Sequence, residues 1–105
     1  MPTKAQVRPH VHLSPEALSF SRQAGIANDL SLALDTAMKH FSIIGSPVVN
    51  LIRDPEIDDS SYLAIEIEVT GGVKDNVRAH REFAAEMAKL LGPKREAIIL
   101  HYSIT

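Results

Sequence analysis

The chain has 105 residues, of which 45% are hydrophobic and 23% charged, as in ordinary folded domains. It contains no cysteine, which excludes disulfides, thiolate catalysis and cysteine-based zinc sites. The net charge is −2 with scattered basic residues, and aromatic residues are two tyrosines and three phenylalanines. The basic stripe and stacking platforms of a nucleic-acid binder are therefore missing.

The N-terminal residues 1–12 carry Pro2 and Pro9 and show neither helical nor strand periodicity. We expect an irregular arm over 1–12, followed by a single α+β domain over 13–105. No apolar run reaches the length of a signal peptide core or a membrane span. The sequence therefore predicts a cytoplasmic protein that binds neither membrane nor nucleic acid.

Two helices are predicted before the first strand. Ser14, Pro15 and Glu16 combine an N-cap hydroxyl, a proline at the first helical position and a carboxylate in the first turn, so a helix should run from 15 to about 24. Gly25 should end it. The second helix is expected from residue 28 or 29 to about 41, because apolar residues recur every three or four positions: Ile26, Leu30, Ala33, Leu34, Ala37 and Phe41.

Two strands follow, joined as a hairpin. Gly45, Ser46 and Pro47 punctuate the chain, and the β-branched run 48–53 predicts the first strand. Strict alternation over 62–70 predicts the second, with one apolar face formed by Leu63, Ile65, Ile67 and Val69. The acidic stretch 54–61 between them is the loop of an antiparallel hairpin.

The last third of the chain predicts a helix and a strand. Gly71 and Gly72 end the preceding strand, and Asp75 is expected to cap a helix that Gly92 and Pro93 terminate. Residues 97–104 alternate as a final strand. The predicted inward stripe of the helix consists of Val77, His80, Phe83, Ala84, Met87, Leu90 and Leu91.

The predicted architecture is a two-layer α+β sandwich with the element order α-α-β-β-α-β. Three helices cover one face of a three-stranded sheet, and the other face is open to solvent or a partner. A right-handed crossover makes the last strand parallel to the strand before it. The sequence leaves open whether these two strands are adjacent or separated by the first strand.

One stretch resembles a group of small prokaryotic proteins. It reads A-M-K-H-F, then V-V-N-L-I-R-D-P-E-I, then Y-L-A-I-E-I-E-V, and lies between Ala37 and Ile104. Those proteins share a helix, a strand ending in D-P-E, an alternating acidic and apolar strand, and another helix. The resemblance covers about two thirds of the chain, supports the element order and implies no activity or catalytic residue.

The candidate metal ligands are His10 and His12. Two positions apart on an extended segment, both imidazoles would lie on the same side, as a two-point metal site requires. Since no third ligand is fixed by the sequence, two exposed histidines in a loose arm are the stronger interpretation. No cofactor is predicted.

The candidate catalytic residues are Glu66, Glu68 and His101 on the open sheet face. A carboxylate and an imidazole within hydrogen-bond reach can act as an acid–base pair, but an open face provides little desolvation to tune them. Cross-strand pairing or an interface is the stronger interpretation of these residues. No nucleophile motif is present, so the sequence favours a protein that is not an enzyme.

The favoured function is a protein-interaction module that forms a homo-oligomer, most simply a dimer, through the open sheet face or an edge. Unpaired strand edges and an uncovered face need a partner or protection. Tyr62 and Ile99 are the predicted interface residues, because an isoleucine on a face expected to be wet suggests burial. The alternative is a small-molecule or metal-dependent site on the same outer face.

Overall fold

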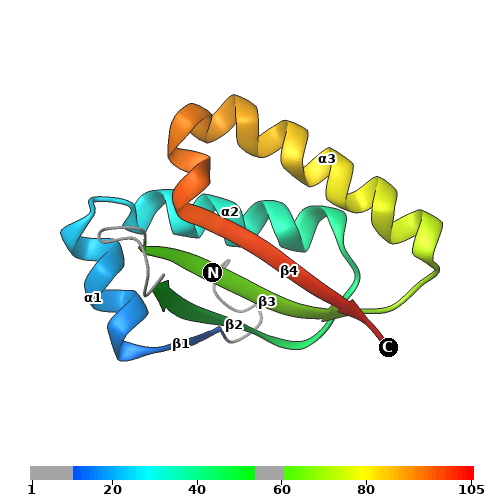
Figure 1. Ribbon diagram of the computed structural model, residues 1–105. Coiled ribbons are helices and arrows are strands. Elements are labelled where there is room, and N and C mark those ends of the chain that lie inside the picture. Colours follow the sequence, from blue (N-terminus) through cyan, green and yellow to red (C-terminus); the bar gives the residue numbers. More distant parts are fainter. Residues whose placement is uncertain (1–10, 54–60) are drawn as a thin grey trace, which may run out of the picture.

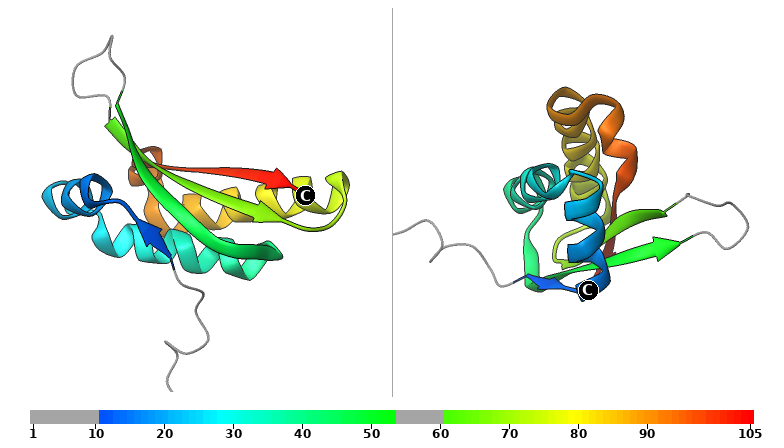
Figure 2. Two further views of the ribbon diagram at one scale, coloured as in Figure 1. Left: turned by 90° about the horizontal axis from the view of Figure 1, so that it is seen from below. Right: turned by 90° about the vertical axis from the view of Figure 1, so that its left-hand side faces the viewer.

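The computed structural model describes residues 11–53 and 61–105. Their elements, in chain order, are β1 (His12–Leu13), α1 (Pro15–Gln23), α2 (Ala27–His40), β2 (Ile43–Arg53), β3 (Ser61–Val69), α3 (Val73–Leu91), a 3₁₀ helix (Gly92–Ala97) and β4 (Ile98–Ile104). The helices lie together on one side of the sheet (Figures 1 and 2). The predicted α+β class is therefore confirmed.

The sheet has four strands in the order β1-β2-β3-β4, rather than the predicted three. β2 and β3 are antiparallel, as predicted, and the outer pairs β1 with β2 and β3 with β4 are parallel. The additional strand, β1, falls partly within the segment expected to be an irregular arm. Because only two residues pair, opposite Val48 and Val49, no periodicity in the sequence could reveal it. The last strand lies directly beside β3, which settles the strand order that the sequence left open.

β2 is longer than predicted and contains a bulge. It begins at Ile43, and the residues Gly45, Ser46 and Pro47 all lie opposite the single residue Ile67. Gly45 has φ 72°, a backbone conformation that favours glycine, and proline is tolerated in a strand at such a bulge. Gly45, Ser46 and Pro47 were expected to precede the first strand of the hairpin. They lie within β2 instead and form its bulge.

The start of α1 follows its sequence signals. Ser14 is the N-cap, and its hydroxyl accepts a hydrogen bond of 3.1 Å from the backbone N–H of Ala17. Pro15 occupies the first helical position, as predicted. Helix α2 buries the whole predicted stripe, from Ile26 to Phe41.

Helix α3 is rotated relative to the prediction. Val77, His80, Ala84 and Leu90 are exposed, so their predicted burial is wrong. Phe83, Met87 and Leu91 of the predicted stripe are buried, as expected, and Asn76 and Ala79 are buried beside them in place of the exposed positions.

The rotation has a cause at the start of the helix. Asn76 is 3% exposed and its side-chain amide donates to the carbonyls of Thr70 (3.1 Å) and Gly72 (2.9 Å). The helix begins at Val73, and Asp75 does not cap it: the N-cap is Gly72, without a side-chain hydrogen bond. A buried polar residue thus sets the inward side, and apolar periodicity alone favours the wrong one.

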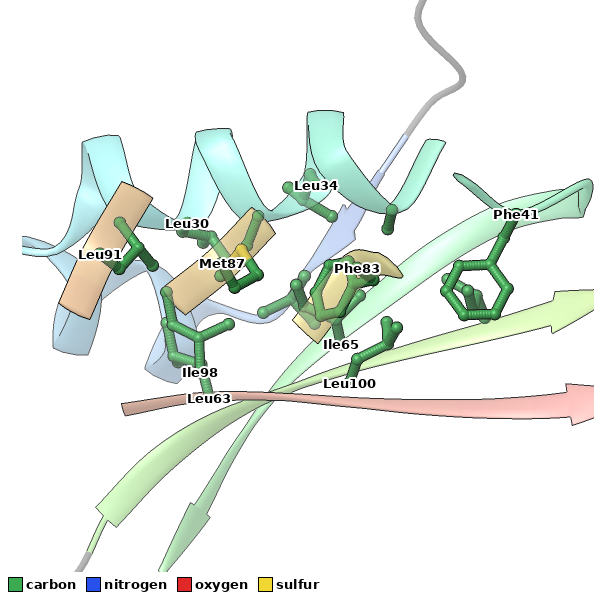
Figure 3. Close-up of a cluster of buried hydrophobic side chains, with 14 of the residues drawn as sticks. Leu30, Leu34, Phe41, Leu63, Ile65, Phe83, Met87, Leu91, Ile98 and Leu100 are labelled. Carbon is green, nitrogen blue, oxygen red and sulfur yellow. The ribbon is translucent and has the colours of Figure 1, made fainter. Parts of the chain in front are cut away.

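The core lies between the sheet and the layer of α2 and α3 (Figure 3). Leu63 and Ile65 of β3 are fully buried, and Phe83 and Met87 of α3 are 6% and 2% exposed. Ile98 and Leu100 of β4 lie beside them in register with Leu63 and Ile65. The predicted inner face of β3 is confirmed.

Candidate functional site: the outer face and free edge of the sheet

The outer face of the sheet carries every described candidate residue of the sequence analysis. Alternation places His12 of β1, Glu66 and Glu68 of β3 and His101 of β4 on the side away from the helices, since their neighbours along each strand point inward. Tyr62 and Ile99 lie on the same side. The predicted grouping on one face is therefore present, and the distances between strands decide which of these residues can act together.

Four residues form a row across the sheet in the order His12, Val48, Glu66 and His101. Neighbouring strands are about 4.8 Å apart, so His12 and His101 are separated by roughly 14 Å along this row. They cannot share a metal ion or a proton. Glu66 and His101, on adjacent strands, are the one pair of the row close enough for direct acid–base contact.

Glu66 is oriented by a different partner. The side-chain amide of Asn50 donates to Glu66 Oε2 at 3.0 Å, from the strand on the side away from His101. Glu66, Glu68 and His101 are all exposed. The geometry therefore offers exposed hydrogen-bonding and charged groups, but not the desolvated pocket in which acid–base catalysis usually takes place.

A hollow of about 380 Å³ lies on this face beside the bulge. The bulge residues Gly45 and Ser46 form one wall, and the polar groups around it come from Asn50, Glu66, Glu68 and Ser103. Sequence reasoning missed this hollow because the bulge that creates it was interpreted as a loop. Its dimensions suit a small polar molecule.

The metal hypothesis receives no support from geometry. In residues 11–53 and 61–105 no three histidine or acidic side chains converge as metal ligands would. His12 lies in β1, exposed on the outer face, and His10 falls outside the described residues. A site that combines these two histidines stays a prediction.

The predicted interface residues flank the most buried position of the outer face. Ala64 is 1% exposed, in register with Asn50 on one side and Ile99 on the other. Ile99 is 38% exposed and Tyr62 is half-buried. Apolar side chains therefore extend from the middle of this face to β4, where Ile99 is the exposed one.

β4 is an edge strand, because among the described strands it pairs with β3 alone. A groove of about 190 Å³ runs beside this edge under α3, and Ile99, His80 and Ala84 are among its lining residues. The His80 ring lies 5.7 Å from that of Tyr102, which in turn lies 5.2 Å from Phe41. Sequence periodicity marked His80 as inward, whereas it borders the edge.

A charged cluster joins the two long helices. Glu86 of α3 accepts hydrogen bonds from Lys39 Nζ (3.0 Å) and contacts His40 Nε2 (2.9 Å) at the end of α2. Both contacts lower the pKa of Glu86 below its usual value, and the contact with His40 has the larger effect. The His40 side chain is 15% exposed, at the margin of the core. The cluster ties α2 to α3 and lies on the helix layer, away from the outer sheet face.

No helix in residues 11–53 and 61–105 combines the length and the hydropathy of a membrane span. No protein-family model matches the chain, and no curated protein or solved structure matches it either.

Proposed function

We propose that the protein is an interaction module that assembles with a second copy of itself through the outer face or the free edge of its sheet. The observation that carries this proposal is β4, a seven-residue strand with neither proline nor a residue of fixed charge, paired with β3 alone among the described strands. Folded proteins ordinarily protect such an edge with lysine, proline, a bulge or a covering segment.

The surroundings of β4 support the same assignment. Ile99 is 38% and Ile104 39% exposed on the strand itself, and Val77 of α3 is 43% exposed. A partner that pairs with the edge would cover apolar side chains as well as satisfy backbone groups. We infer a cytoplasmic homodimer that is not an enzyme in its own right.

Size-exclusion chromatography with light scattering at micromolar concentration tests the proposal. We expect twice the mass of the chain, and a monomer throughout contradicts it. Ile99→Lys places a charge on the proposed contact and should weaken association about tenfold or more. Ser19→Lys, on the exposed surface of α1, is the matched control and should leave the mass unchanged.

A second candidate function is a small-molecule or metal-dependent site on the outer face, and the hollow beside the bulge favours a small molecule. Glu66 with Asn50, and Glu68 with Ser103, would contact a polar ligand there. Native mass spectrometry and metal analysis of the purified protein test this candidate. A stoichiometric ligand that is lost in Glu66→Gln supports it, and ligand-free protein in both forms contradicts it.

A further inference from the structure

Each backbone group of β4 points either to β3 or to the free edge. The N–H of Thr105 donates to the carbonyl of Val69 in β3 at 3.0 Å. Since the N–H and C=O of a strand residue point to the same side and the side alternates along the chain, Ile99, His101 and Ser103 also bond towards β3. The groups of Ile98, Leu100, Tyr102 and Ile104 therefore face the free edge.

We propose that two copies of the chain pair antiparallel along β4, with a two-fold axis at His101, to form one continuous eight-stranded sheet. This inference rests on the proposed self-association and specifies its edge, direction and register. His101 is the middle residue of β4, so the axis there pairs the whole strand: Leu100 lies opposite Tyr102 of the second copy, and Ile98 opposite Ile104. Every one of these residues offers edge-facing backbone groups, and each opposite pair exchanges two hydrogen bonds.

Charge favours this edge over stacking of the two outer faces. Two-fold stacking would bring the exposed carboxylates Glu66 and Glu68 of both copies into one interface, where like charges are costly to desolvate. The strand β4 carries no fixed charge. Pairing along β4 therefore brings no fixed like charges of the two strands together, whereas stacking of the outer faces does.

Helix α3 provides a matching stripe beside the edge, apolar except for His80. Val73, Val77, His80 and Ala84 follow the spacing of one helix face, and all are exposed, Val73 at 68%. His80 and Ala84 line the groove along β4. A two-fold axis at His101 would run the two α3 helices antiparallel above the joined strands, so that each stripe covers the other.

The two edges of the sheet differ in a way that selects β4 for this role. On the opposite side, β1 pairs with only two residues of β2, and the bulge at Gly45 to Pro47 interrupts the strand beside it. Bulges and short edge strands discourage pairing with another chain. β4 has no bulge in its register with β3, and a second strand can follow it over its full length.

Single-cysteine variants test the register directly, because the chain has no other thiol. Residues opposite each other without hydrogen bonds have Cβ atoms about 4.5–5.5 Å apart, near the span of a disulfide. His101→Cys should therefore form a covalent dimer under mild oxidation. Ile99→Cys and Ser103→Cys should not cross-link alone, since each lies about 13 Å from its own copy, but an equimolar mixture of the two should.

Two further variants separate this inference from the proposed function. Tyr62→Cys and Glu68→Cys lie on the outer face away from the edge and should stay uncrosslinked. One outcome overturns the edge register while self-association stands. In it, the protein is a dimer in light scattering and cross-links at position 62 or 68, but neither at position 101 nor in the mixture of the 99 and 103 variants. A monomer in light scattering overturns both. If His101→Cys fails to fold by circular dichroism, the 99 and 103 mixture decides the register.

Discussion

The two faces of β3 differ sharply in burial. Leu63 and Ile65 on the inner face are fully buried, whereas Glu66 and Glu68 on the outer face are exposed. Ala64 breaks the contrast, because it is buried although it points outward. Alternation of apolar and polar residues in the sequence therefore identifies the face of the strand that packs into the core. It does not show how much of the opposite face is buried.

The largest effect is expected from the inner face. Ile65→Ala and Phe83→Ala should each lower the free energy of unfolding by about 2–5 kcal/mol, because each leaves a cavity between β3 and α3. Urea denaturation followed by circular dichroism measures both changes. Glu66→Ala is the outer-face control: it removes the acceptor of the exposed hydrogen bond from Asn50 and should cost about 0.5 kcal/mol. Equal losses for Ile65→Ala and Glu66→Ala would show that the outer face is as buried as the inner one.

Helix α3 allows the same contrast on one helix. Met87→Ala should cost about 2–5 kcal/mol, since Met87 is 2% exposed, and Leu90→Ala should stay within about 0.5 kcal/mol, since Leu90 is 47% exposed. Both are measured by urea denaturation. A loss for Leu90→Ala as large as that for Met87→Ala contradicts the observed orientation of the helix and restores the predicted stripe, in which both residues face inward.

The start of α3 should be sensitive to Asn76. Asn76→Ala removes two hydrogen bonds to backbone carbonyls at a position 3% exposed, which should cost about 1–3 kcal/mol. Asp75→Ala is the neighbouring control, with an expected cost of about 0.5 kcal/mol from the helix dipole. Thermal unfolding compares them. An Asn76→Ala variant as stable as the native protein would mean that these bonds do not set the rotation of α3.

The smallest effect concerns the cluster that joins α2 and α3. Because the pKa of Glu86 is lowered in the folded chain, its charged form contributes stability above the usual glutamate pKa, and that contribution is lost as the pH falls through the lowered value. Glu86→Gln should flatten the loss of stability in this acidic window. Urea denaturation at neutral and acidic pH measures it, and an unchanged slope would show that the contacts with Lys39 and His40 contribute nothing.

Periodic elements could be predicted from the sequence, and elements defined by distant pairing could not. The stripe of α2, the alternation of β3 and the capping signals around Ser14 each reside in a short window, and each is confirmed. The two-residue strand β1 exists only because Val48 and Val49 accept it as a partner. The bulge at Gly45 was misread because glycine and proline mark both loops and bulged strands.

In the candidate site too, local features could be predicted from the sequence and features that depend on distant pairing could not. Alternation correctly placed Glu66, Glu68 and His101 on the outer face, since side-chain period is a local property. The hollow beside the bulge and the hydrogen bond from Asn50 to Glu66 depend on how β2 bends against β3. The free edge of β4 depends on strand order, which required the whole fold.

Hydrogen exchange of the β4 amides tests the central claim most directly, because neighbouring amides point to opposite sides of the strand. The amides of Ile99 and His101 face β3 and should be protected in any folded state, whereas those of Leu100 and Tyr102 face the free edge. The edge pairing predicts protection at all four positions in concentrated protein, with Leu100 and Tyr102 losing it on dilution. Fast exchange of Leu100 and Tyr102 at every concentration, beside protected Ile99 and His101, would contradict it.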